Sequence, residues 1–293
     1  MTEYICLINN FNYSQYLPAC IDSALSQSLP FNKIIIVDDG SSDNSREVIE
    51  SYQNHNPKII SIFQENQGQM STFNAAEHLI PDNSQVFLLD ADDVYPSDYL
   101  ELMAEKFPTR IPNFTFCSPR YTKSAEISFI DSARAGNQKT QIFPKPSAIV
   151  RSRRCWIGSP TSCISMSGSL FKTIFPYPYA SEFRIRADDG IIFAASLEGS
   201  EKAYIPSLSI IYRVHEKNGF YNTSATKSAS IKHDAAILKL ISYFCTKLNI
   251  NPNPSISEFF SEIRHLSQEQ KSSLNLPSMY RVINRLIRKR FFG

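Results

Sequence analysis

The chain has 293 residues, enough for one large α/β domain with an appendage or for two small domains. Apolar residues make up 42% of it and charged residues 20%, the composition of an ordinary globular protein with a sizeable core. The formal net charge is only +2, which excludes a strongly basic chain, so nucleic acid is not expected as a partner.

Cysteine spacing and hydropathy argue against a zinc-binding, a secreted or a membrane-spanning protein. The six cysteines form no C-x-x-C pair, which argues against a zinc site. Glu3 and the Asn9-Asn10 pair interrupt the first apolar run, so it does not resemble a secretory signal. No apolar stretch reaches the roughly 18 residues that a membrane span needs. A reducing, cytoplasmic protein is therefore expected.

Residues 1–95 alternate strand and helix patterns. Short apolar runs predict four strands, at 4–8, 34–37, 59–63 and 86–89. Apolar residues at helical spacing predict a helix after each of the first three strands. The order βαβαβαβ favours a Rossmann-like α/β domain with a mostly parallel sheet flanked by helices and right-handed crossovers.

The remainder of the chain is less regular. Helices are predicted at 97–107, 167–175, 190–197 and 257–266, and strands at 113–117, 126–130 and 207–214. From Lys227 the pattern turns helical, and one face of the helix carries Ile231, Ala235, Leu238, Ile241 and Cys245.

A division into three segments follows from these patterns. We expect one domain over residues 1–226, made of a half at 1–100 and a half at 101–226, followed by a helical C-terminal extension over 227–293.

Carboxylates follow two of the predicted strands. Asp38 and Asp39 end the second strand, and Asp90, Asp92 and Asp93 end the fourth. In open α/β sheets ligands bind beyond the carboxyl ends of the strands, so both clusters should face one crevice. Carboxylates so close together repel one another, and hard oxygen ligands favour Mg²⁺ or Mn²⁺. The alternative is that these aspartates only cap turns and helices.

The same segments resemble the family 2 glycosyltransferases with the GT-A fold. The resemblance is carried by Asn9-Asn10-Phe11-Asn12, Ile36-Val37-Asp38-Asp39-Gly40-Ser41-Ser42-Asp43 and Leu89-Asp90-Ala91-Asp92-Asp93. The family usually opens with P-T-Y-N, where this chain has the asparagine-rich segment. The resemblance implies a metal-dependent, inverting transfer of a sugar from a nucleotide-diphosphate donor, most commonly a UDP-sugar, to an acceptor hydroxyl in polysaccharide, glycan or glycolipid synthesis.

The resemblance also implies where the donor and metal lie. Donor contacts are expected from the residues that match the family's first-half motifs and its N-x-G segment, namely Asn10, Asn12, Asp38, Asp39, Gly68, Asn74 and Asp90. The metal ligands are expected to be Asp90, Asp92 and Asp93, because a bound cation neutralises the diphosphate leaving group.

Two later segments match the family in order. Asp188 and Asp189 stand where the family usually has E-D at a helix start, and one of them would remove the acceptor proton. An ordinary helix N-terminus rich in aspartate is the alternative. Tyr212-Arg213-Val214-His215 resembles the Y-R-x-H block, which implies that Arg213 faces the diphosphate and that His215 is a late metal or phosphate ligand. The alternative for His215 is an ordinary surface or core histidine.

Two further features are noted outside the motifs. Trp156 follows a basic run, Arg151-Ser152-Arg153-Arg154, and would either stack on a sugar ring or pack in a loop. The tail at 279–292 has the pattern of a basic amphipathic helix. It would lie on the inner face of an anionic membrane, in keeping with a lipid-linked acceptor, or pack on the catalytic domain.

Two other functions fit parts of the sequence. A haloacid-dehalogenase-like phosphatase would use Asp90 as nucleophile and Asp92 as acid/base, but its motif normally sits on the first strand. A module that binds nucleotide sugars without transferring them would keep Asp39 and the D-x-D block but lack a working base.

Overall fold

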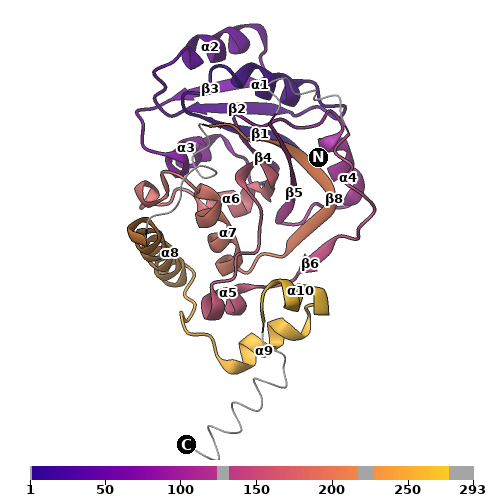
Figure 1. The fold of residues 1–293 in the computed structure, drawn as a ribbon, viewed down its shortest axis with the longest axis vertical. Helices are drawn as coiled ribbons and strands as arrows, with labels where there is room; N and C mark the ends of the chain where they lie inside the picture. Colours follow the sequence, from indigo (N-terminus) through magenta and orange to yellow (C-terminus); the bar gives the residue numbers. More distant parts are fainter. Residues whose placement is uncertain (1, 124–131, 217–226, 277–293) are drawn as a thin grey trace, which may run out of the picture.

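The computed structural model describes residues 2–123, 132–216 and 227–276. Within them, eight strands form one sheet in the order β3-β2-β1-β4-β7-β5-β8-β6 (Figure 1). The strands are β1 Glu3–Asn10, β2 Lys33–Asp38, β3 Ile59–Phe63, β4 Ser84–Asp90, β5 Phe114–Thr122, β6 Gln141–Phe143, β7 Ile164–Ser167 and β8 Lys202–Arg213.

The first four strands are parallel, as the alternating pattern predicted. Beyond β4 the sheet is mixed, because β7 runs antiparallel to both β4 and β5 while β5 and β8 are parallel. The β-branched run Ile34–Val37 lies in β2 and is fully buried, as expected for a strand that helices cover on both faces.

Ten α-helices surround the sheet in the described part of the chain. They are α1 Leu17–Leu25, α2 Ser45–His55, α3 Gln69–Ala76, α4 Tyr99–Lys106, α5 Ser147–Arg153, α6 Gly168–Ile174, α7 Ala187–Glu198, α8 Lys227–Lys247, α9 Ile256–Arg264 and α10 Gln268–Ser273. None of the described helices is both long and apolar enough to cross a membrane.

An apolar core lies on each face of the sheet, and each core is covered by its own layer of helices. Alternate residues of one strand point to opposite faces, so Ile5 and Leu7 join one core while Cys6 and Ile8 join the other. The first core is closed by α3, α6 and α7 with α5 and α8 beyond them, and the second by α1, α2 and α4 (Figure 1). This is the three-layer α/β architecture that the element order predicted.

The buried face of α8 is not the full apolar stripe seen in the sequence. Ile231 and Leu238 belong to that stripe but are 61% and 53% exposed. Leu240 and Phe244 face the core instead, and the Phe244 ring stacks on Tyr177 with centroids 5.9 Å apart. Packing against this aromatic cluster rotates the helix away from the face that periodicity alone selected.

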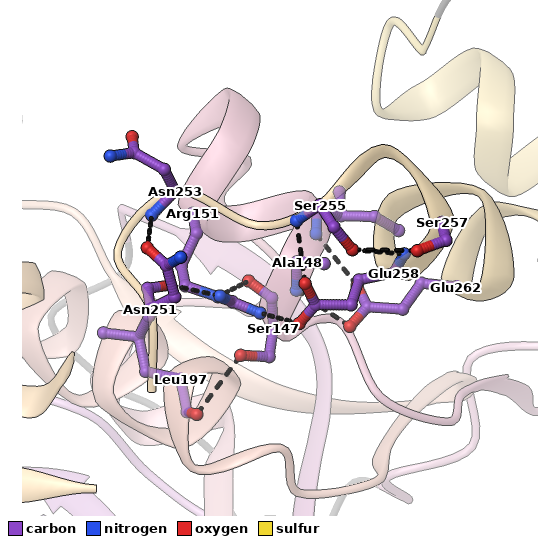
Figure 2. A network of polar contacts seen from close by, with 11 residues as sticks. Ser147, Ala148, Arg151, Leu197, Asn251, Asn253, Ser255, Ser257, Glu258 and Glu262 are labelled. Carbon is purple, nitrogen blue, oxygen red and sulfur yellow. Dashed lines mark hydrogen bonds and ion pairs between the residues drawn. The ribbon is translucent and has the colours of Figure 1, made fainter. Parts of the chain in front are cut away.

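The helical extension is fixed to the rest of the chain through α5 (Figure 2). Glu262 of α9 accepts hydrogen bonds from the backbone N–H groups of Ala148 and Ile149, each at 2.8 Å, and thereby caps the first turn of α5. Arg151 of α5 reaches back to Glu258 at 3.2 Å and also donates to the carbonyl of Asn251. These contacts hold α5 at its start and its middle.

Two predicted elements lie outside the described residues. These are the strand at 126–130 and the amphipathic tail at 279–292.

Candidate active site

The carboxyl ends of the parallel strands bring the predicted acidic clusters to one edge of the sheet. In the β1–β2 pairing Asn10 lies opposite Asp38, and in the β1–β4 pairing Asn9 lies opposite Asp90. A cavity of about 1090 Å³ opens beyond this edge. Of the predicted site residues, those that line it are Asn10, Asp39, Gly68, Asp90, Asp92, Asp188 and Asp189.

Three aspartates form one cluster after β4. Asp90, Asp92 and Asp93 can each present a carboxylate oxygen so that all three oxygens lie within 4.8 Å of one another. Burial is the largest cause that raises the pKa of Asp90 to about 8, and the charge of Asp92 raises it further. The pKa of Asp93 is raised well above its usual value for the same two reasons, burial first and then Asp92. Such a cluster of hard oxygen ligands suits a divalent cation, whose charge would offset the repulsion.

The members of this cluster are held by different partners. Asp93 is fully buried and accepts from the Ser162 hydroxyl at 2.5 Å and from the Arg213 backbone N–H at 2.9 Å. Asp92 lies 2.9 Å from Nε2 of His215. The Asp93 carboxylate is therefore fixed from behind, while Asp90 and Asp92 reach the cavity.

Arg213 and His215 lie behind the cluster and are not among the residues that line the cavity. The Arg213 guanidinium donates to the backbone oxygen of Asp92 at 2.9 Å and lies over the Tyr16 ring. The His215 ring lies 4.6 Å from that of Tyr16. The Y-R-x-H segment thus supports the aspartates by holding Asp92 and Asp93.

Asp39 organises the loop that follows β3. Its carboxylate accepts from the Gln64 side chain at 2.6 Å and from the backbone N–H groups of Gln67 and Gly68 at 2.8 Å each. Gly68 has φ +95°, and a Cβ added there would lie 2.4 Å from the Cα of Arg184. Only glycine therefore lets this loop lie against the segment that precedes α7.

The asparagines of the first loop divide into two roles. Asn10 donates to Asp38 at 2.7 Å, and its buried Oδ1 has no hydrogen-bond partner within the described protein. An orphaned buried acceptor on a cavity wall fits a ligand that carries an N–H or O–H group. Asn12 and Asp38 do not line the cavity, and both bind the Ser41–Ser42 segment.

Asn74 is not brought to the cavity. Its amide group donates to the backbone oxygen of Tyr177 at 2.9 Å and accepts from the backbone N–H of the same residue at 2.8 Å. Asn74 therefore joins α3 to the segment before α7, and its expected contact with the nucleotide stays a prediction.

Gln69 is a central residue that the sequence analysis missed. Its Nε2 donates to the Asp90 carboxylate at 2.9 Å and to the Thr161 hydroxyl at 3.2 Å. Its Oε1 accepts from the backbone N–H of Ala187, the first residue of α7, at 3.0 Å. Only this orientation of the amide satisfies both a carboxylate and an N–H group. One side chain thus links the aspartate cluster to the start of α7.

The two aspartates of α7 have different surroundings. The Asp189 carboxylate is buried and lies 2.7 Å from Arg186 and 2.9 Å from His233. Asp188 is only half-buried, and its Oδ1 accepts from the Asp189 backbone N–H. Burial is the largest cause that raises the pKa of Asp188 to about 7, followed by the negative charge of Asp189. Of the pair, Asp188 has the pKa of a group that can take up a proton near neutral pH.

Comparison with known proteins agrees with this arrangement. Residues 6–166 match the model described as Glycosyl transferase family 2. An uncharacterized glycosyltransferase of Nostoc sp. is 35% identical over 243 residues, which cover 79% of this chain and 71% of that protein. Chondroitin synthase of Escherichia coli is 32% identical over 97 residues, but the matched part is only 14% of its length.

Solved structures share the fold at low sequence identity. S. aureus TarS 1-349 in complex with UDP-GlcNAc aligns with a TM-score of 0.57 and 12% identity, over 94% of this chain and 77% of that one. The mannosyltransferase PcManGT of Pyrobaculum calidifontis, in complex with GDP-Man and Mn²⁺, aligns with a TM-score of 0.55 and 14% identity, over 82% and 63% of the two chains. These likenesses confirm the GT-A fold. The family match leaves no support for a phosphatase, and the chain belongs to glycosyl transferase family 2 and is a glycosyltransferase.

Proposed function

We propose that this glycosyltransferase is metal-dependent and inverting, and that it moves a sugar from a nucleoside-diphosphate donor to the hydroxyl of a glycan or lipid-linked acceptor. The observation that carries the proposal is the pairing of two acidic centres on one cavity. One is the cluster of Asp90, Asp92 and Asp93, and the other is Asp188, whose pKa stands near neutrality.

The aspartate cluster fits a cation better than it fits bare carboxylates. Without one, burial and the charge of Asp92 raise the pKa of both Asp90 and Asp93, which makes the charged carboxylates unfavourable. Asp90 and Asp92 line the cavity and would hold Mg²⁺ or Mn²⁺ there together with Asp93. A bound divalent cation would supply charge neutralisation for the departing diphosphate.

The donor side is formed by the first loop and the Asp39 loop. The unpartnered Asn10 Oδ1 would accept from the nucleotide base or ribose, and Asp39 and Gly68 place the loop backbone beside it. Among the structural relatives, TarS 1-349 is found with UDP and with UDP-GlcNAc, which supports a UDP-sugar as the first donor to test.

Asp188 is the group we assign as general base. It takes the proton of the acceptor hydroxyl, whose oxygen forms a bond to the anomeric carbon while the bond from that carbon to the diphosphate oxygen breaks. A single displacement of this kind inverts the configuration at the anomeric carbon. Asp189 is held by Arg186 and His233, and its role is to raise the pKa of its neighbour.

The test begins with binding of UDP, GDP, CDP and dTDP by calorimetry, each with and without Mn²⁺. We expect one nucleotide to bind tightly only with the metal, and Asp92→Asn to lose that binding. Asp82→Asn is the matched control, since Asp82 is an exposed aspartate paired with Lys172 outside the cavity. Nucleotide binding that ignores both the metal and the Asp92 change would refute metal dependence.

The second part separates a catalyst from a binding module. Asp188→Asn should bind the donor as the wild-type protein does but lose at least about 100-fold in hydrolysis of the UDP-sugar, a lower bound for removal of a general base. A wild-type protein that binds the donor and never cleaves it would favour the non-catalytic alternative.

A further inference from the structure

The large cavity continues from the strand ends to the segment that follows α5. Its volume of about 1090 Å³ is at the upper end for a small-molecule site, so it has room beyond a donor. The residues that line this added part include Arg153, Arg154 and Trp156. None of them has a role in the donor site described above.

Positive charge in this part of the cavity lacks a counter-charge. No carboxylate of the described residues pairs with Arg153 or Arg154, and Arg184 bonds only to the oxygens of Asn66. Arg186 is paired with Asp189. Asp234 is an exposed carboxylate that also lines the cavity, but it forms no ion pair with Arg153 or Arg154 among the described residues. The balance favours an anionic ligand.

The backbone at Arg154 is unusual for an arginine. Its φ and ψ are 52° and 40°, and its N–H closes α5 on the carbonyl of Val150 at 2.7 Å. Glycine is the usual residue at such a left-handed helix end, because a side chain is disfavoured there. Arg151 and Arg153 already place positive charge in the last turn of α5, so the helix dipole does not require another.

The support for these arginines is rigid. Glu262 caps the start of α5 and Arg151 ties its middle to Glu258, so the end of the helix is presented from a fixed base (Figure 2). Two residues on, the Trp156 side chain is 42% exposed on the cavity wall. An exposed indole beside two guanidinium groups can cover a sugar ring while the guanidinium groups bind a phosphate.

We propose that Arg153, Arg154 and Trp156 form an acceptor subsite for a phosphate-bearing sugar. The guanidinium groups bind the phosphate and the indole ring packs on the neighbouring sugar. This inference rests on the proposed function, because it names the acceptor of the same cavity. A lipid diphosphate and a phosphate-containing polymer present the same phosphate chemistry to the arginines, and the probes below distinguish the two sources.

Trp156 offers a direct measurement, because it is the one tryptophan of the sequence. Its fluorescence is followed in the full chain, loaded with UDP and Mn²⁺, during titration with three probes. These are farnesyl-diphosphate-linked N-acetylglucosamine, a short glycerol phosphate oligomer carrying N-acetylglucosamine, and the neutral octyl N-acetylglucosaminide. We expect at least one phosphate probe to bind at least tenfold more tightly than the neutral one, and more weakly as salt is raised.

The variants separate folding from binding. In Arg153→Gln/Arg154→Gly the preference for phosphate should disappear, while the thermal midpoint stays unchanged or rises because glycine suits the backbone at 154. Arg264→Gln removes an exposed arginine outside the cavity, and Asn249→Gly relieves another left-handed helix end. Both controls should keep the preference.

Each outcome of the titration either assigns the source of the phosphate or overturns the subsite. Preference for the farnesyl probe assigns the lipid-linked source, and preference for the oligomer assigns the polymer. Equal binding of all three probes, no binding of any, or a preference that survives in the double variant would overturn the subsite. UDP binding is measured separately by calorimetry, and its failure counts against the proposed function alone. Weaker UDP binding in the double variant would assign the arginines to the donor and also overturn the subsite.

Discussion

Replacing Gln69 by methionine tests whether one side chain couples the two acidic centres. Methionine has a similar length but can neither donate to Asp90 nor accept from Ala187. The lost bond to the charged acceptor is worth about 1.5–3 kcal/mol, and the bond to the helix N–H about 0.5–1.5 kcal/mol. Donor binding through Asp90 should therefore weaken by about 10-fold to 100-fold, because each ~1.4 kcal/mol is a factor of ten.

Loss of the weaker bond, from the Ala187 N–H to Gln69, should lower the turnover rate. Without its bond to Gln69, the start of α7 is less well held, and Asp188 lies one residue beyond it. We expect kcat for UDP-sugar hydrolysis to fall by about 2-fold to 10-fold, the range that a neutral hydrogen bond gives. Donor affinity is measured by calorimetry with Mn²⁺, and turnover by release of UDP.

Gln67→Met is the matched control, because Gln67 is exposed and contributes only its backbone N–H to Asp39. It should leave affinity and kcat unchanged. A Gln69→Met protein that is less stable to heat, yet binds and turns over the donor like the wild type, would refute the coupling and leave Gln69 a purely structural residue.

Three other outcomes follow from the site. Gly68→Ala should destabilise the loop by at least about 1 kcal/mol and weaken UDP binding, since a Cβ there meets Arg184 and the backbone has positive φ; equal affinity would contradict this. Asp189→Asn should lower the pKa of Asp188 from about 7, so the rising limb of the hydrolysis rate should move to lower pH; an unmoved limb would exclude Asp188 as the titrating base. The pKa of Asp90 is raised to about 8 in the folded protein, so between about pH 4 and 8 the folded metal-free protein holds more protons than the unfolded chain. The stability of the metal-free protein should therefore fall as pH rises through this window. The gain in melting temperature with Mn²⁺ should be larger at pH 8 than at pH 6.

The first half of the fold was accessible from the sequence because its signals are local. The predicted strand segments all lie within β1 to β4, since each is a short apolar run bounded by turn residues. The acidic residues directly follow two of these strands, so the topology of a parallel sheet alone brings them to one edge. Here local pattern and tertiary structure agree.

The features that the sequence did not predict depend on contacts between residues far apart in the chain. The bond from Gln69 to Ala187 joins residues 118 positions apart, and no spacing rule indicates it. The face of α8 was chosen by the aromatic cluster around Tyr177, which overrode the simplest helical stripe. The run Arg151–Arg154 looks uniform, yet Arg151 holds α9 while the last two arginines line the cavity.

The adjacent aspartates of α7 show how environment separates residues that a sequence presents as equals. Consecutive helical residues point about 100° apart, so the two carboxyls have different surroundings: Asp189 is buried against Arg186 and His233, and Asp188 is half-buried on the same cavity. Arg186 and His233 lie against the Asp189 carboxylate, and the negative charge of Asp189 raises the pKa of the Asp188 carboxyl. Two titratable groups whose surroundings differ in this way are typical of an acid–base site. His233 of α8 lies against Asp189 together with Arg186, so under the proposed assignment of Asp188 as the base the helical extension contributes to the chemistry of the domain on which it packs.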